Sequence, residues 1–319
     1  MKKVKAVAYP TIPIIFVASV NEKGVPLHDT MGLAVTDLKE EVRSETTIEV
    51  RPKKEGVSFL LEGKPLDEEK RMADIINVFE QFKRTAKKDT GLKIESSNYN
   101  IFSGSSDSGA AALVFALNEL FATNLPKEKI TELGNIISES AIRSLYGGLN
   151  KYVVSGGKPY GLQLASEEDL REIRIFAFCF EYKARVSAEE IFNICKAGPY
   201  WEMRLKRVPF WVKNIEEGLK NKDWKRVFSN AEENCANAHY LIESGGRRCR
   251  RKEMMDVCID VEEIRASGLP AYWTAGGGRV INVFSWGEDS KKVLEELERR
   301  GHVPIEYKVA SGPKIIFKE

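Results

Sequence analysis

The sequence has little of what several functional classes require. Three histidines, and five cysteines without a Cys-x-x-Cys spacing, indicate neither a zinc site nor a disulfide framework. Lys and Arg number 49 against 47 Asp and Glu, so the formal charge of +2 provides no basic field for nucleic acid. The longest apolar stretch, residues 6–20, is too short for a membrane span and contains two prolines. We expect a cytoplasmic protein that binds neither nucleic acid nor membrane.

What is present is typical of an ordered protein with two domains. The chain has 319 residues, of which 43% are hydrophobic and 9% aromatic. Apolar periodicity predicts strands within residues 3–62, 92–101 and 172–181, and helices over 67–87 and 127–146. A charged helical region follows over about 188–265. The chain then ends in a stretch of strands with one helix over 290–300. This order predicts an α+β fold. We place the domain boundary between residues 187 and 188, giving domains 1–187 and 188–319.

A run of small residues, SGSSDSGAA at positions 103–111, lies between a predicted strand and a predicted helix. Small residues allow a ligand to approach the backbone, and a helix N-terminus offers unpaired N–H groups to phosphate. The run lacks the Gly-Lys-Ser/Thr of a Walker loop. It is either a phosphate-binding loop or a plain turn in which Ser106 or Asp107 caps the helix. Asp107 would repel a bare phosphate but could hold Mg²⁺.

Two further segments carry candidate binding groups. In SESAIRSLYGG, residues 138–148, helical spacing would place Glu139 and Arg143 on one face. Together they could hold a hydroxyl and a carboxylate of one small substrate, or they could form a surface ion pair. In YWTAGGGR, residues 272–279, a strand enters three glycines, which favours either close approach of the backbone to a ligand or a plain loop.

The histidines and basic runs give weaker signals. His28 and His239 stand apart from other metal-ligating residues, so structural roles are favoured and we expect no metal-binding cluster of side chains. Basic residues gather at 204–207 and 247–252. Acidic residues nearby indicate solvated surfaces, although such runs could also meet a phosphorylated ligand.

Several segments together resemble a known family. VAYPTIPIIF, VPLHDTMGLAVTDL, ETTIEV, NYNIFSGSSDSGAAAL and SESAIRSLYGGL follow one another between residues 7 and 149. In this order and spacing they resemble the diphosphomevalonate decarboxylase branch of the GHMP kinases, and within it the archaeal mevalonate 3-kinases. The resemblance weakens after about residue 150 and returns at LPAYWTAGGGRV, residues 269–280.

The resemblance implies a GHMP fold of two α+β domains with the active site in the cleft between them. Arg143 matches an arginine that grips the mevalonate carboxylate, Glu139 a glutamate near the 3-hydroxyl, and Ser103 a serine on the substrate side. These three are the candidate catalytic residues. The resemblance also implies ATP and Mg²⁺ as cofactors, with nucleotide contacts from Gly104, Ser105, Ser106, Asp107, Ser108 and Gly109. We assign substrate contacts to Phe16, His28, Ser140, Arg143 and Thr274.

Two departures from the decarboxylases decide the predicted reaction. Phe16 stands where the decarboxylases have a lysine, and Thr274 stands where they have an aspartate. A threonine has no carboxylate and so cannot take over the role of that aspartate. The 3-kinases share both departures, although Val17-Ala18-Ser19 replaces their paired glycines. We therefore predict phosphorylation of the 3-hydroxyl of (R)-mevalonate.

Two alternative functions remain at this stage. One is a decarboxylase that acts on mevalonate 3,5-bisphosphate without ATP. The other is a non-catalytic relative that binds an isoprenoid precursor. Homodimers are common in the family, but nothing in the sequence specifies an interface.

Overall fold

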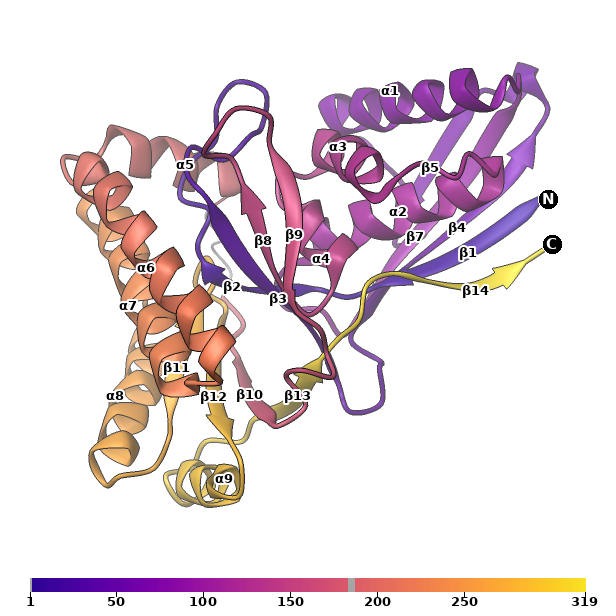
Figure 1. Cartoon of the computed structure of the whole chain (residues 1–319). Helices are drawn as coiled ribbons and strands as arrows, with labels where there is room; N and C mark the ends of the chain where they lie inside the picture. The colour runs from indigo at the N-terminus through magenta and orange to yellow at the C-terminus, as the bar shows by residue number, and fades with distance from the viewer. Residues whose placement is uncertain (1, 183–186) are drawn as a thin grey trace.

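A computed structural model describes residues 2–182 and 187–319. Two large β-sheets lie side by side, and helices pack on both (Figure 1). The predicted α+β class is confirmed. No helix within the described ranges has the length and apolar character needed to cross a membrane.

The first sheet has six strands in the order β14-β1-β4-β7-β5-β6. Its pairs are antiparallel except β5 with β7, and the two ends of the chain meet where Val4 pairs with Lys318 (Figure 1). Its strands are β1 (Lys3–Ala8), β4 (Arg43–Arg51), β5 (Val57–Leu61), β6 (Lys64–Pro65), β7 (Gly91–Tyr99) and β14 (Lys314–Lys318).

The second sheet has eight strands in the order β11-β12-β10-β13-β3-β8-β9, with β2 paired to β3. Because β10 pairs with β12 and β13, this sheet joins strands from both sides of residue 187. The division into domains at that residue stays a prediction. The strands are β2 (Thr11–Ile15), β3 (Thr30–Asp37), β8 (Leu149–Val153), β9 (Tyr160–Ala165), β10 (Ile173–Cys179), β11 (Tyr272–Ala275), β12 (Val280–Trp286) and β13 (Ile305–Val309).

The helices divide between the two sheets (Figure 1). Those near the first sheet are α1 (Glu69–Ala86), α2 (Ser105–Phe121) and α3 (Lys127–Ile137), with a short 3₁₀ turn η1 (Lys53–Glu55). The short helix α4 (Ala141–Tyr146) packs on α2 and contacts β3, β8 and β9 of the second sheet. Those near the second sheet are α5 (Ala188–Ala197), α6 (Trp201–Asn221), α7 (Trp224–Ser244), α8 (Lys252–Ala266) and α9 (Asp289–Arg299). Apolar stripes explain the packing, since α1 buries Ile75, Val78, Phe79 and Phe82 on one side.

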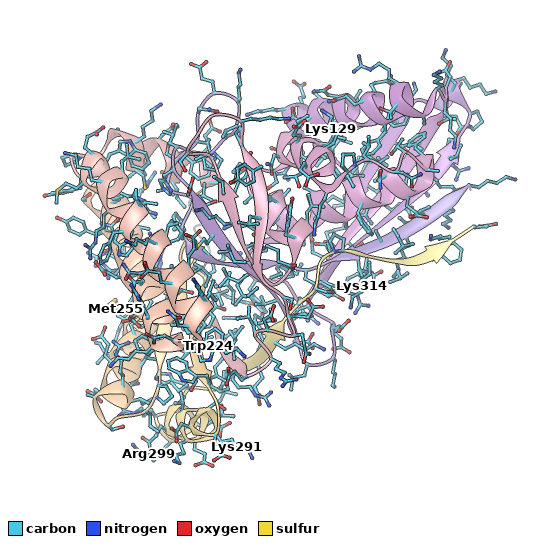
Figure 2. All side chains as sticks on the ribbon, in the orientation of Figure 1. Lys129, Trp224, Met255, Lys291, Arg299 and Lys314 are labelled. Carbon is cyan, nitrogen blue, oxygen red and sulfur yellow. The ribbon has the colours of Figure 1, made fainter. Side chains whose placement is uncertain are left out.

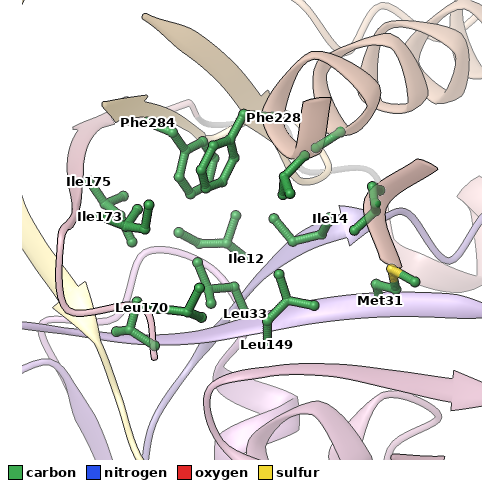
Figure 3. Close-up of a cluster of buried hydrophobic side chains, with 14 of the residues drawn as sticks. Ile12, Ile14, Met31, Leu33, Leu149, Leu170, Ile173, Ile175, Phe228 and Phe284 are labelled. Atoms are coloured by element: carbon green, nitrogen blue, oxygen red, sulfur yellow. The ribbon is translucent and has the colours of Figure 1, made fainter. Parts of the chain in front are cut away.

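Large apolar clusters hold these layers together. Between α7 and the second sheet, the rings of Phe228 on α7 and Phe284 on β12 stack with their centroids 4.4 Å apart (Figure 3). Trp224 belongs to the same buried cluster, and its indole N–H donates to Glu172 at 2.8 Å. Lys129, Lys291 and Arg299 project outward instead (Figure 2). The apolar layers therefore fix the sheets, and charged residues cover the outside.

The predicted helix over residues 127–146 is wrong in one respect. The chain forms two helices, α3 and α4, separated at Ser138, whose backbone is extended (φ −148°, ψ 125°). No proline or glycine lies at this break. Beside the break the Ser140 hydroxyl donates to Asp107, and within α4 the Ser144 hydroxyl donates to the Tyr9 carbonyl, so hydrogen bonds to other elements hold α4 in its place.

Candidate active site

A cavity of about 150 Å³, here the first cavity, lies where the start of α2, the α3–α4 break and the β11–β12 turn meet. It includes eight residues that the sequence analysis selected: Phe16, Ser103, Gly104, Ser106, Asp107, Glu139, Ser140 and Arg143. His28 and Thr274 do not line it. The structure thus brings together residues that are up to 127 positions apart in the chain (Phe16 to Arg143).

The small-residue run forms the N-terminus of α2. Gly104 caps the helix with a left-handed backbone (φ 81°), and neither Ser106 nor Asp107 caps it with a side chain. A Cβ at Gly104 would lie 2.9 Å from the backbone nitrogen of Thr11, so glycine is needed there. The first backbone N–H groups of α2 have no partner within the helix, because its first bond joins the Ser108 N–H to the Gly104 carbonyl. This start of the helix can therefore accept an anion.

The Asp107 carboxylate is a structural centre of the site. Its side chain is 3% exposed and accepts hydrogen bonds from the Thr11 hydroxyl at 2.5 Å, the Ser140 hydroxyl and the Arg143 guanidinium at 2.8 Å. These donors come from β2, the α3–α4 break and α4. Because its oxygens are engaged, Asp107 orients neighbouring side chains rather than facing a ligand.

Arg143 lies over a glycine of β3. A Cβ at Gly32 would overlap the Arg143 side chain, so the absence of a side chain there makes room for the guanidinium. The Arg143 side chain is 11% exposed and retains a buried Nε without a partner among the described residues. Arg143 therefore has donors left for a ligand after it binds Asp107.

Glu139 lies in the break between α3 and α4, not on a helix as the spacing suggested. Burial, together with the nearby Asp107 carboxylate, raises the pKa of Glu139 above its ordinary value. No side chain of the described residues donates a hydrogen bond to Glu139, unlike Asp107. Glu139 is thus a carboxylate of the cavity that can accept a proton or a hydrogen bond from a ligand.

The β11–β12 turn closes the other side of the cavity. A Cβ at Gly276 would lie 3.3 Å from the Ser103 hydroxyl oxygen, so this turn meets the segment before α2. Gly277 and Arg279 also line the cavity. Arg279 was not among the predicted site residues, although its position directly after three glycines was an available signal.

Phe16 is held by two residues of the helical region. Its N–H donates to the Asn234 side chain at 2.9 Å, and its carbonyl accepts from Arg204 at 2.8 Å. Arg204 is fully buried and also bonds to Asn237 and His28, so its assignment to a solvated surface was wrong. No local pattern indicates this burial, because a buried arginine and a surface arginine look alike within a basic run.

The two remaining candidates, His28 and Thr274, are buried and do not line the first cavity. Burial and the nearby Arg204 charge lower the pKa of His28 to about 3, so its imidazole is neutral. Thr274 on β11 is fully buried, and its hydroxyl has no hydrogen-bond partner within the described chain. Their assignment as substrate contacts stays a prediction.

A second cavity, of about 470 Å³, adjoins the first. Both cavities are lined by Ser106, Glu139 and Ala188. The second is also lined by Ser105 and Gly109, and a Cβ at Gly109 would meet no atom within 4 Å. Ser108, by contrast, is fully buried and bonds to Ser44. The start of α2 therefore stands between a small cavity and a larger one.

Comparison with known proteins decides the family. A family described as "Diphosphomevalonate decarboxylase-like N-terminal domain" matches residues 16–158. The mevalonate 3-kinase of Picrophilus torridus is 30% identical, across 99% of this chain and 98% of that protein. The chain belongs to the family of mevalonate 3-kinases and diphosphomevalonate decarboxylases. The mevalonate 3-kinase of Thermoplasma acidophilum is 28% identical, across 88% of this chain and 87% of that protein.

Solved structures of the family share the fold. The mevalonate 3-kinase of T. acidophilum with mevalonate 3-phosphate and ADP bound superposes with a TM-score of 0.89 at 24% identity, covering 100% of this chain and 99% of that chain. The mevalonate diphosphate decarboxylase of Staphylococcus aureus gives a TM-score of 0.87 at 21% identity, covering 99% and 98%. The predicted GHMP-type fold is confirmed.

Two of the solved structures in the family contain ADP or AMPPCP. The open space at Gly109 and the unpaired N–H groups of α2 suit phosphates. The described residues contain no cluster of three or more metal-ligating side chains. Mg²⁺ commonly relies on substrate phosphates and one or two protein oxygens, which Glu139 and Ser106 could supply here.

Proposed function

We propose that the protein is an ATP-dependent mevalonate 3-kinase, which transfers the γ-phosphate of ATP to the 3-hydroxyl of (R)-mevalonate. The observation that carries the proposal is the shared wall of the two cavities. A nucleotide in the larger cavity and an alcohol in the smaller one would meet at Ser106 and Glu139. Such adjacency supplies the positioning on which phosphoryl transfer mainly depends.

The residues of the first cavity have distinct roles in this reaction. Glu139 would accept the hydrogen bond of the 3-hydroxyl, since its oxygens receive no side-chain donor among the described residues. Arg143, held by Asp107, would orient the carboxylate, and Ser103 would hydrogen-bond the substrate from the start of the loop. The backbone N–H groups at the start of α2 would stabilise charge on the transferred phosphate. Mg²⁺ bound with the nucleotide would neutralise further phosphate charge.

Phosphorylation without decarboxylation is favoured by the β11–β12 side of the first cavity. The residues that line it from this side are Gly276, Gly277 and Arg279, none of which is a carboxylate. Thr274, at the position of the decarboxylase aspartate, is buried away from the cavity. The basic runs do not favour a bisphosphate either, because none of their members lines either cavity.

The test is ADP release by the purified protein with Mg-ATP and (R)-mevalonate. We expect turnover with the wild type and a loss of about 100-fold or more in kcat for Glu139→Gln and Arg143→Ala. Arg247→Gln is the matched control, because Arg247 pairs with Glu190 on the surface and lines neither cavity. The absence of ADP release, together with CO₂ release from mevalonate 3,5-bisphosphate without ATP, would replace the proposal with a decarboxylase.

A further inference from the structure

The first cavity contains a cation that no carboxylate of the described chain neutralises. Its charged lining residues are Asp107, Glu139, Arg143 and Arg279. Arg143 is paired with Asp107 at 2.8 Å. Arg279 forms no ion pair within residues 2–182 and 187–319, and its Nη2 donates only to the Tyr182 carbonyl, at 3.2 Å. Its Nε is buried without a hydrogen-bond partner among these residues.

The backbone of Arg279 is firmly placed. Gly278 before it has a left-handed backbone (φ 101°), and a Cβ there would lie 2.5 Å from the Cys249 carbonyl oxygen. The carbonyl of Arg279 accepts the Phe180 N–H at 2.8 Å, and β12 begins at the next residue. Residues 183–186 are Lys-Ala-Arg-Val and contain no acidic side chain that could neutralise the guanidinium.

A half-buried guanidinium with a buried, unpartnered N–H is costly unless a ligand completes its hydrogen bonds. An anion is the natural complement, because a guanidinium binds carboxylate or phosphate oxygens through two parallel N–H groups. The Arg143 charge is already offset by Asp107, so Arg143 can orient a ligand but adds little net charge. Arg279 is the side chain that can supply the missing counter-charge.

We propose that Arg279 binds an anionic group of the acceptor substrate from the β11–β12 side of the first cavity. The identity of that acceptor rests on the function proposed above. The anionic group is the carboxylate of mevalonate or, in a phosphorylated acceptor, a phosphate ester. Arg279 thereby selects acids over neutral alcohols that carry the same hydroxyl.

The experiment measures binding by calorimetry in the absence of ATP. The ligands are (R)-mevalonate, its 5-phosphate ester, and the carboxylate-free 3-methylpentane-1,3,5-triol. The proteins are the wild type, Arg279→Gln, Arg279→Lys and the control Arg251→Gln. The Arg251 guanidinium lies over the Tyr182 ring at 4.8 Å, but Arg251 does not line the first cavity. Arg251→Gln therefore removes a positive charge beside the same tyrosine without changing the cavity.

We expect Arg279→Gln to weaken binding of mevalonate by about 10- to 100-fold, with triol binding unchanged and partial recovery in Arg279→Lys. A loss confined to the 5-phosphate would assign Arg279 to a phosphate instead of the carboxylate. Equal binding of both acids by the wild type and Arg279→Gln would overturn the proposal. An equal loss for the triol, or an equal loss in Arg251→Gln, would overturn it as well.

The binding test of Arg279 can be distinguished from the activity test of the proposed kinase. If the wild type binds mevalonate but forms no 3-phosphate with ATP, the kinase proposal fails and the Arg279 comparison still stands. If the wild type binds neither acid, both proposals fail. Thermal unfolding followed by circular dichroism shows whether each variant is folded before its binding is measured.

Discussion

Replacing Asp107 with asparagine is the substitution that most directly perturbs the organisation of the site. Asp107 is 3% exposed and Arg143 11% exposed, so both charges are largely removed from water. Asparagine keeps the size of the side chain and one acceptor oxygen. It leaves the guanidinium without a counter-charge, and its amide N–H₂ faces either the Ser140 donor or the Thr11 and Arg143 donors, according to which oxygen it replaces.

The expected loss of stability follows from this burial. Removing one partner of a buried ion pair costs about 3–5 kcal/mol, and the retained amide oxygen places Asp107→Asn near about 3 kcal/mol. Urea unfolding followed by circular dichroism measures it as a lower midpoint with an unchanged slope. We also expect kcat/KM for mevalonate to fall by at least about 10-fold, because Ser140 and Arg143 lose their common anchor.

A double-mutant cycle makes the reasoning refutable. Asp107→Asn combined with Arg143→Met should show a coupling of about 2 kcal/mol, since the two residues contact each other directly. The control Asp89→Asn removes an exposed carboxylate that pairs with Lys53 and Lys83, and should leave the midpoint unchanged. A stability within about 0.5 kcal/mol of the wild type, or a coupling near zero, would refute the central role of Asp107.

Three other predictions concern glycine, glutamate and histidine. Gly32→Ala should displace the Arg143 side chain and lower kcat/KM by about 10-fold in steady-state assays. The control Gly63→Ala, at a left-handed turn (φ 74°) that lines neither cavity, should cost stability but leave kcat/KM unchanged; equal activity of the two variants would contradict the tight contact. Because the pKa of Glu139 is raised, kcat should fall as the pH drops through that raised value, and Glu139→Gln should lack this pH dependence in a pH–rate profile. His28 stays neutral in the folded protein down to about pH 3 but takes up a proton near 6.5 when unfolded. Acid therefore favours unfolding, and between about pH 6.5 and pH 3 His28 alone should lower the free energy of unfolding by about 1.4 kcal/mol per pH unit. His28→Asn should reduce the measured slope by about this amount, and an unchanged slope would contradict a buried neutral imidazole.

Much of the fold could be predicted because its signals are local. Alternation of polar and apolar residues predicted the strand over residues 43–51, and an apolar stripe predicted the helix over 67–87, which forms as α1 over Glu69–Ala86. The paired glycines at 147 and 148 correctly marked the end of α4. The family resemblance, carried by the small-residue run and the segment at 138–149, is confirmed.

What the sequence could not predict depends on contacts between distant segments. The break at Ser138 is accompanied by hydrogen bonds from Ser140 to Asp107 and from Ser144 to Tyr9, which no helix propensity reports. Arg204 is buried because it bonds to Phe16 and Asn237, which lie 188 and 33 positions away. Arg279 lines the cavity because the β11–β12 turn, which contains Gly276, lies against Ser103. Gly276 and Ser103 are 173 positions apart in the chain. Such pairings follow from the topology and not from a local pattern.

The most direct test of the account is the fate of the carboxyl carbon during turnover. Purified protein is supplied with Mg-ATP and (R)-mevalonate labelled with ¹³C at the carboxylate, and the products are followed by ¹³C and ³¹P NMR. The account predicts that ADP forms together with a phosphate ester on the tertiary carbon, with all of the label retained in the carboxylate. Release of the label as CO₂, or a phosphate ester on the primary hydroxyl, would contradict it.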